Sequence, residues 1–510
     1  MGIDACTYRK LLLAFLLLVI ALPACGAQEI DPAKNCPANA ITVVCPDGTK
    51  LCAQDSDFQP GVNLCTKVRL ARIASALTES MIRCPDRVWP GYDWRRLQVV
   101  LVESEAHAAL LWNDQRKDAG DDEVKLTWMP YADLPSNYKL ESGDFEFGQL
   151  HGVPTLGIGA ACTDDGTIQS AIHEGFHFTG DNEFANTQNG SSRGLTYPID
   201  YQPRYLRYHV ILSLSRALFS GDSKALGAAR YWYDQYLKRY PEDSKEHGAL
   251  DIAEGTAQYV GLVGTALAKV GCKASEAELL SAAKEMCQPD AGEELDWVNP
   301  GDAESYQIGV IAGLLLRQRN APQWQEHIAK GTPPLDLLLK HVKPIHQKDD
   351  KRLLARVKEF CQQRNDEIGV VVDTFFKQMG SADHFTVAVP LQWMASSFST
   401  DGFVNTTLKG KQHNLILGMS VPLQSPDGSA RGTIDGAVTE LLTESPRGSE
   451  PLIVFPVTRS ALQSKDRVLS IDSPGFNLSG ITVEILEIGG KGAPWLFLQP
   501  YSPPSSDMRL

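Results

Sequence analysis

The segment His173–His177, with the sequence His-Glu-Gly-Phe-His, contains side chains that could bind and use a metal ion. His173 and His177 are four residues apart, so on a helix their imidazole rings project from one face and can reach a single ion. Glu174 would lie beside that ion, where its carboxylate can accept a proton from a water molecule that the ion has made more acidic. The spacing therefore predicts a helix that binds zinc (Zn²⁺) through the two histidines, with Glu174 as the catalytic general base.

The residues before this segment favour a helix with one apolar face. Ile168, Ala171 and Ile172 recur at helical spacing. Asp165 or Thr167 is the expected N-cap. Two ordinary histidines are the alternative, since the bare pattern arises by chance in roughly one or two of a hundred such chains. The apolar context favours the metal-binding interpretation.

A catalytic zinc ion needs a third protein ligand and one open position. Glu254 shares a helical stripe with Leu250 and Ala257, and a carboxylate on an apolar stripe is costly unless it meets a cation. The pattern therefore predicts Glu254 as the third ligand. A salt bridge or a helix N-terminus could satisfy Glu254 instead. Asp251 and His247 lie on a similar face and are further candidates for the third ligand or for a contact with a ligand.

This arrangement resembles the gluzincin metallopeptidases, in which two HExxH histidines and a Glu from a later helix bind zinc. The stretch that starts at Glu254 is similar to the Glu-Gly-x-Ala-x-Tyr form that carries the third ligand in several of these families. The segment Ser305–Gly309 is similar to the Tyr-x-Lys-Gly segment of the aminopeptidase N and glycyl aminopeptidase families. The resemblance implies that Tyr306 donates a hydrogen bond to the oxyanion. Ile308 stands where those families have Lys, and the strand around Gly157 lacks the Glu that anchors a substrate amino terminus, so strict aminopeptidase specificity is not implied.

Strands are expected before the helices. Leu97–Glu103 is a compact β-branched run that predicts a buried strand. Val153–Gly159 predicts a second strand, which its proline and glycines would place at the edge of a sheet. We therefore expect a substrate peptide to pair with this edge, near Thr155, Gly157 and Gly159.

The remaining chain divides into a helical and a β part. Apolar residues three and four apart predict helices from Thr167 to about Met379. The clearest runs are Tyr205–Phe219, Lys224–Tyr240, Leu250–Val270 and Tyr306–Arg317. After Gly380, short alternating runs separated by Asp-Gly and Pro-Asp-Gly turns predict an all-β module of sandwich type. The expected class is α+β, with a zincin-like catalytic domain over 86–379 and a C-terminal β domain over 380–510.

The N-terminus has the layout of a secretory signal. Two basic residues precede an apolar run, Leu11–Leu22, that is too short to span a membrane as a stable helix. The following residues, Leu22–Gly26, resemble the lipobox of bacterial lipoproteins, which would leave Cys25 lipidated. Plain cleavage near Ala24 or Ala27, which would give a soluble secreted product, is the alternative. We expect residues 1–25 to be a signal peptide, and the protein to be exported to a bacterial cell envelope as a lipoprotein, or to be secreted or periplasmic.

Nine cysteines follow Cys25, and export makes disulfides their expected state. Five of them crowd a cysteine-rich segment, 26–85, where metal binding is the alternative. Cys272 and Cys287 flank a helical stretch and could form a further pair.

Length and charge narrow the function classes. A chain of 510 residues is too long for one ordinary domain, so two or three are expected. A net charge of -14 without a basic stripe argues against a nucleic-acid partner. Together, these features predict an exported zinc-dependent peptidase that hydrolyses peptide or protein substrates with a zinc-bound water. The alternative is a catalytically inactive, surface-displayed binding or structural lipoprotein with a zinc site; membrane anchoring is expected only through a lipidated Cys25.

Overall fold

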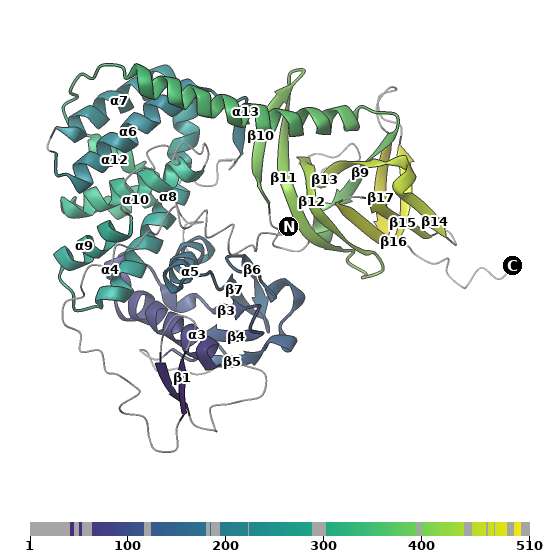
Figure 1. The fold of residues 1–510 in the computed structure, drawn as a ribbon, viewed down its shortest axis with the longest axis horizontal. Coiled ribbons are helices and arrows are strands. Elements are labelled where there is room, and N and C mark those ends of the chain that lie inside the picture. The colour runs from purple at the N-terminus through teal and green to yellow at the C-terminus, as the bar shows by residue number, and fades with distance from the viewer. Residues whose placement is uncertain are drawn as a thin grey trace.

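The computed structural model describes most of the chain after residue 63 as a mixture of helices and strands, compatible with the predicted α+β class (Figure 1). The described residues are 64–116, 124–179, 184, 194–222, 224–287, 302–394, 400–442, 451–465, 468–473, 475–486 and 494–500, with two short strands, β1 (Ile41–Val44) and β2 (Lys50–Ala53). The expected signal peptide and its lipidation site, Cys25, lie outside these residues.

Five strands form the sheet that carries the site helix. Their order is β5 (Thr127–Pro130), β4 (Ala108–Trp112), β3 (Val99–Glu103), β7 (Val153–Gly159) and β6 (Phe145–Leu150). β3 pairs antiparallel with β4 and parallel with β7, which makes it a central strand. Both strands expected from the sequence are therefore confirmed as strands, and the apolar character of β3 reflects burial on both faces.

The edge position predicted for Val153–Gly159 is wrong. β7 is hydrogen-bonded to β3 on one side and to β6 on the other, so its backbone cannot also pair with a substrate near Thr155, Gly157 and Gly159. The glycines permit close packing against the segment that precedes β6. A Cβ atom on Gly157 would lie 2.7 Å from the Tyr138 ring, and one on Gly159 would clash with the Glu141 carbonyl oxygen, in the turn before β6. Thr155 is fully buried.

The α-helices pack against one face of this sheet and then extend away from it (Figure 1). Near the sheet lie α3 (Leu64–Leu77), α4 (Pro85–Val88) and α5 (Asp164–Thr179). The helical part contains α6 (Tyr201–Phe219), α7 (Ala225–Arg239), α8 (Pro241–Val270), α9 (Glu276–Met286), α10 (Asp302–Gln318), α11 (Trp324–Ala329), α12 (Pro334–Leu339) and α13 (Lys351–Met379). All four predicted helical runs are confirmed. α8 begins earlier than expected, because Pro241 and two acidic residues favour a helix start there.

The strands after residue 380 form one sheet with β8, and not the predicted sandwich. The order is β14 (Leu462–Lys465), β15 (Val468–Ser473), β16 (Phe476–Leu486), β17 (Trp495–Pro500), β9 (His384–Pro390), β13 (Leu452–Thr458), β12 (Arg431–Leu442), β11 (Lys411–Gln424), β10 (Gly402–Leu408) and β8 (Leu195–Tyr197). The first part of β12 pairs with β16 and its last part with β13. This second pairing closes five strands into a ring. Gly436, at a φ of 66°, lies between the two parts and lets β12 bend.

β8 joins the site region to the C-terminal strands. It follows α5 in the sequence, yet it pairs in parallel with β10. The Asn405 side chain on β10 donates to the Gly194 carbonyl, and the Asn365 side chain on α13 bonds both backbone groups of Ile199. A three-residue strand is too short to be predicted from its sequence pattern.

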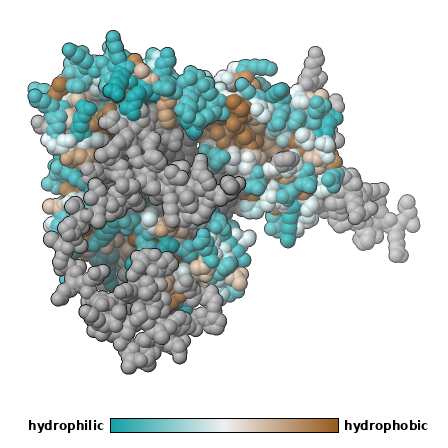
Figure 2. Space-filling view, viewed as in Figure 1, coloured by the Kyte–Doolittle hydropathy of each residue, from teal (hydrophilic) through white to brown (hydrophobic). Residues whose placement is uncertain are grey.

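Hydrophobic side chains gather where α13 passes over the C-terminal strands, on the face drawn in Figure 2. A groove of about 310 Å³ lies between α13 and these strands; Val370, Phe375, Val438 and Phe455 are among the residues that line it. Among the described helices, none has both the length and the apolar character that crossing a membrane requires.

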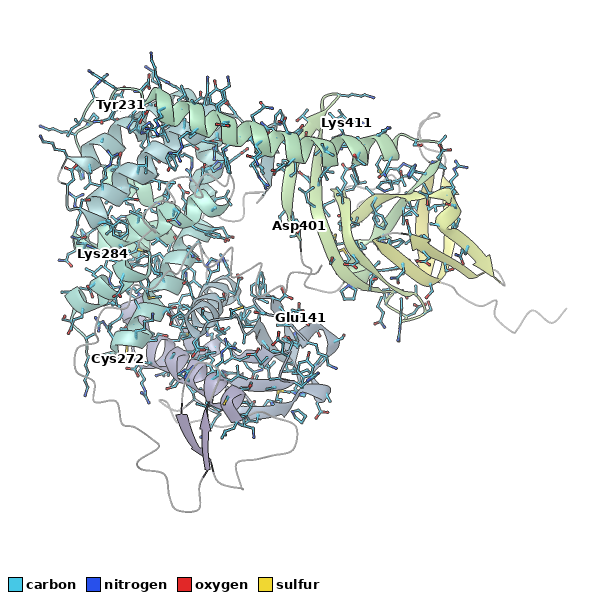
Figure 3. The ribbon with its side chains drawn as sticks, viewed as in Figure 1. Glu141, Tyr231, Cys272, Lys284, Asp401 and Lys411 are labelled. Carbon is cyan, nitrogen blue, oxygen red and sulfur yellow. A yellow bond between two sulfur atoms is a disulfide. The ribbon has the colours of Figure 1, made fainter. Side chains whose placement is uncertain are left out.

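A disulfide between Cys84 and Cys272 links the residue before α4 to the turn after α8; the two Cα atoms are 5.9 Å apart. Figure 3 labels Cys272. The predicted pairing of Cys272 with Cys287 is wrong, and Cys287 is a free thiol. Hydrogen bonds from the Cys272 N–H to Glu79 and from Arg87 to the Cys272 carbonyl direct this turn toward Cys84. Cys65 and Cys162 also take part in disulfides.

Removing this disulfide is expected to lower the free energy of unfolding by about 3–5 kcal/mol, because the cross-link restricts the unfolded chain over a long loop. The two cysteines are 188 residues apart. The measurement is guanidinium denaturation of a Cys84→Ser, Cys272→Ser double variant beside a Cys287→Ser control. An equal loss of stability in the control would contradict the prediction. So would a double variant that is less stable than wild type whose disulfides have been reduced.

Candidate metal centre

The N-terminal end of the site helix, α5, is held by a capping hydrogen bond and by ion pairs with α3. The Thr163 hydroxyl oxygen accepts a hydrogen bond from the Gly166 N–H at 3.1 Å, so the helix starts upstream of both predicted caps. Asp164 in the first turn accepts hydrogen bonds from Arg69 at 2.9 Å and Arg72 at 2.6 Å, both on α3. These contacts and the helix dipole stabilise the acidic first turn.

α5 lies on the sheet through the apolar face expected from the sequence. Ile168, Ala171 and Ile172 are all buried. A Cβ atom on Gly175 would lie 2.6 Å from a Leu97 methyl group, so a glycine at this position lets the helix approach the residues that lead into β3. Packing of this face turns the opposite side of α5, with its histidines, toward α8.

The structure brings the three predicted metal ligands together. The Nε2 atoms of His173 and His177 are 3.1 Å apart. The Glu254 Oε2 atom is 3.6 Å from the His173 nitrogen and 3.5 Å from the His177 nitrogen. A tetrahedral ion bonded at about 2.0–2.1 Å holds its ligand atoms roughly 3.3–3.4 Å apart. Two imidazole nitrogens and one carboxylate oxygen at these distances fit a divalent metal ion.

Gln258 orients the first of these ligands. Its Oε1 atom lies 3.0 Å from the His173 Nδ1 atom. An amide oxygen only accepts hydrogen bonds, so Nδ1 carries the proton and Nε2 keeps its lone pair for a metal. Sequence reasoning missed Gln258. The available signal was its position four residues after Glu254, on the same face of α8.

α8 reaches α5 at a glycine. A Cβ atom on Gly261 would lie 2.9 Å from the Gln169 carbonyl oxygen and 3.4 Å from the His173 Cβ atom. The two helix backbones are therefore in direct contact beside the first histidine. A larger residue at this position would push Glu254 away from the imidazole nitrogens.

α8 also meets α10 at a pair of glycines. A Cβ atom on Gly255 would lie 2.6 Å from the Ser305 carbonyl oxygen, and one on Gly309 would overlap the Gly255 backbone. This crossing places Tyr306 beside the predicted metal ligands. Its ring centre is 5.7 Å from that of His173, in an edge-to-face arrangement.

No family model, curated protein or solved structure matches this chain. What the centre can do therefore depends on the side chains around the ligands. Glu174 and Tyr306, the predicted catalytic residues, line a cleft of about 340 Å³ together with His173 and Gln258. The Glu174 carboxylate lies 3.9 Å from the His173 Nε2 atom, and 14% of its side chain is exposed. A proton-accepting group and a hydroxyl donor thus border the same open space as His173, one of the three predicted ligands.

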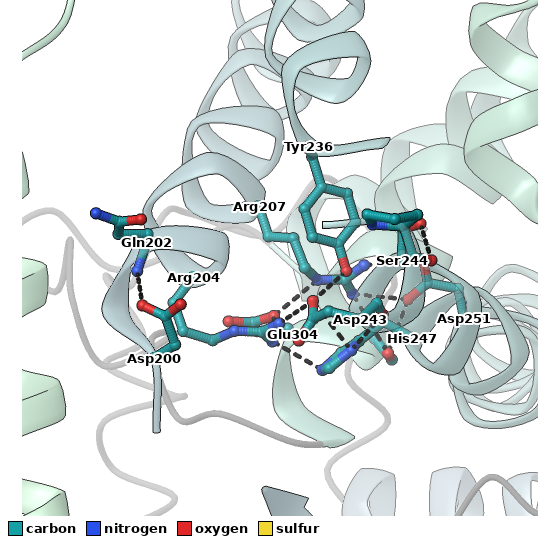
Figure 4. Close-up of polar contacts among 12 residues, drawn as sticks. Asp200, Gln202, Arg204, Arg207, Tyr236, Asp243, Ser244, His247, Asp251 and Glu304 are labelled. Atoms are coloured by element: carbon teal, nitrogen blue, oxygen red, sulfur yellow. Dashed lines mark hydrogen bonds and ion pairs between the residues drawn. The ribbon is translucent and has the colours of Figure 1, made fainter. Parts of the chain in front are cut away.

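Asp251 and His247, the other candidates for the third ligand, belong to a different set of contacts (Figure 4). The Asp251 carboxylate accepts hydrogen bonds from Arg207 at 2.8 Å and from the Ser305 hydroxyl at 2.7 Å. His247 lies 2.7 Å from an Arg204 nitrogen. Burial, together with the two guanidinium groups, holds the pKa of His247 well below its usual value. Sequence reasoning missed both arginines, although they stand three apart among apolar residues of a helix.

Proposed function

We propose that this protein is a zinc-dependent peptidase in which His173, His177 and Glu254 hold the metal ion. The observation that carries the proposal is the spacing of 3.1 to 3.6 Å among three donor atoms of mostly buried side chains, beside a cleft. Two histidines and one carboxylate leave a fourth tetrahedral position open, which is typical of catalytic zinc sites and not of structural ones. The zincin-like catalytic domain expected from the sequence is part of this proposal.

Zinc in this site would make a water molecule more acidic and polarise the carbonyl group of a peptide bond. Glu174 accepts the proton of the attacking water and delivers it to the leaving amine. The Tyr306 hydroxyl donates a hydrogen bond to the oxygen that becomes negatively charged. Gln258 keeps His173 in the tautomer that presents Nε2 to the metal.

The substrate backbone is expected at β6 in place of β7. Among the described strands, β6 pairs only with β7, so its other edge is available for an added strand. β6 also lies close to the end of α5, because the Phe147 ring stacks on the Phe178 ring at 5.4 Å. A peptide that extends β6 would therefore run past the end of the helix that carries both histidines.

Metal analysis followed by a peptide-library digest tests this function. We expect about one zinc ion per chain, because among the described residues the other group that could hold a metal includes Cys84 and Cys272, which are joined in a disulfide. We also expect cleavage that a chelator stops and added zinc restores. The absence of metal would overturn the proposal. Stoichiometric zinc without cleavage of any peptide, also after the N-terminal segment is trimmed, would favour the surface-displayed binding or structural protein.

Substitutions of the ligands should produce graded losses of zinc affinity. His177→Ala and Glu254→Ala are each expected to abolish stoichiometric binding, because each removes a direct ligand. Gln258→Ala is expected to weaken binding by about 10- to 100-fold, since it only orients His173. Competition with a chromophoric chelator measures all three. Stoichiometric zinc in Glu254→Ala would reassign the third ligand.

A further inference from the structure

Two arginines of α6 lie in the protein interior, next to the helices that carry the metal centre (Figure 4). Only 4% of the Arg204 side chain and 2% of the Arg207 side chain are exposed. A buried guanidinium group is costly unless its hydrogen bonds and its charge are matched. The groups that pair with these arginines therefore identify the helices that the buried charges connect.

The two arginines and their partners form one connected cluster. The Arg207 Nε atom donates to the Glu304 carboxylate at 2.7 Å, and another of its nitrogens donates to the Asp251 carboxylate at 2.8 Å. Arg204 donates to the same Glu304 oxygen at 2.6 Å. The Ser305 hydroxyl donates to Asp251 at 2.7 Å. A single guanidinium group, that of Arg207, thus connects three helices.

The partners stand beside the residues of the proposed site. Asp251 precedes Glu254 by three residues on α8, which is close to one turn of the helix. Glu304 precedes Tyr306 by two residues on α10. Any rotation or sliding of α8 or α10 that moves Glu254 or Tyr306 would also break a contact with Arg207.

The close crossing of α8 and α10 at two glycines does not by itself fix how the two helices are rotated relative to each other. Gly255 and Gly309 let α8 and α10 touch, but glycines have no side chains that interlock and prevent one helix from turning against the other. Stability alone is a weak reason for buried charges, because apolar residues of similar volume often stabilise a protein as well or better. The planar guanidinium group donates its hydrogen bonds only in fixed directions, so it also sets the orientation of the carboxylates that accept them.

We propose that Arg207, Asp251 and Glu304 are positioning residues for the metal centre. They fix how α8 and α10 are turned relative to α6, and so hold Glu254 and Tyr306 in place. This inference rests on the proposed metal site, but it does not require that the protein cleaves peptides.

The test is the zinc affinity of Asp251→Asn and Arg207→Lys, measured by chelator competition at a temperature where circular dichroism shows each variant to be folded. We expect affinities about 10- to 100-fold weaker than that of wild type, the range found when a group that orients a metal ligand is removed. Arg207→Lys keeps the positive charge but loses the planar set of N–H donors. It therefore serves as the second variant if Asp251→Asn does not fold.

Asp114→Asn is the matched control. The buried Asp114 carboxylate accepts two hydrogen bonds from Arg116 at 2.9 Å and one from the Thr127 hydroxyl at 2.9 Å, much as Asp251 does from Arg207 and Ser305. It follows β4 and has no contact with α8 or α10 among these bonds. The control is expected to lower the melting temperature and leave zinc affinity unchanged.

Three outcomes would overturn the inference. Unchanged zinc affinity in both cluster variants would make the cluster a stabilising feature only. An equal loss of affinity in Asp114→Asn would show that affinity follows general stability. Wild type that binds no zinc would contradict the ligand set itself. Wild type that binds zinc and cleaves no peptide would overturn only the proposed function, and the comparison of affinities would still test positioning.

Discussion

Glu174→Gln is expected to lower kcat/KM for peptide cleavage by about 100- to 10,000-fold, the usual contribution of a general base, while zinc stays bound. Glutamine has nearly the same shape as glutamate but cannot accept a proton at neutral pH. Glu174 is not one of the three converging ligands, and its carboxylate borders the cleft, so its loss should affect chemistry and not metal binding. Kinetics and zinc content are measured on the same preparations.

Asp165→Asn is the control for this variant. Asp165 lines the same cleft, but its carboxylate forms an ion pair with Lys269 at 2.6 Å in which 39% of the Asp165 side chain is exposed. Its substitution is expected to change kcat/KM only a few-fold, since exposed ion pairs contribute about 0–1 kcal/mol. Full activity in Glu174→Gln would exclude the assigned role, and loss of zinc there would show that Glu174 supports the metal instead.

Gly309→Ala is expected to lower the free energy of unfolding by about 3 kcal/mol or more, at the upper end of the costs of overpacking. The added methyl group would overlap the Gly255 backbone. Backbone cannot rotate away as a flexible side chain can, so α8 and α10 must separate. Because Glu254 is adjacent to Gly255, zinc affinity should fall as well. Denaturation is measured with a chelator present, so that bound metal does not contribute to the difference.

Gly248→Ala provides the comparison, on α8 itself. A Cβ atom there would meet only a Pro333 carbon at 3.4 Å, which is an ordinary contact. Alanine favours a helix over glycine by roughly 0.5–1 kcal/mol, so this variant should be as stable as wild type or slightly more stable. Similar losses in both variants would mean that the close crossing of α8 and α10 is not the cause.

The parts of the site that could be predicted from the sequence depend on rules that operate within one helix. The spacing of His173 and His177 is such a rule, and so is the contrast between Glu254 and the apolar residues on its stripe. The structure brings these three side chains within 3.6 Å of one another. Tyr306 was singled out by a resemblance, and its place beside His173 depends on the Gly255 crossing.

The parts that could not be predicted depend on partners far away in the sequence. Arg207 and Asp251 are 44 residues apart, and nothing in either local sequence indicates the other. Cys272 pairs with a cysteine 188 residues before it instead of the nearer Cys287. The proline and glycines of β7 suggested an edge, but β7 lies between two strands, and its glycines permit close packing against the segment before β6. Alternating residues after Gly380 predicted strands correctly, and such alternation is the same in a sandwich and in a ring.

The pairing of β8 with β10 sets a condition on when the protein can finish folding. Gly194, just before β8, is 211 residues upstream of Asn405, to which its carbonyl is hydrogen-bonded. At about 5–20 residues per second, a ribosome needs roughly 10–40 s to make the chain between them. During that interval the segment after α5 has no β10 to pair with. A chain that stops before Gly402 therefore lacks the final neighbours of the segment that follows the site helix, and β8 can form its native pairing only when nearly four-fifths of the protein has been synthesised.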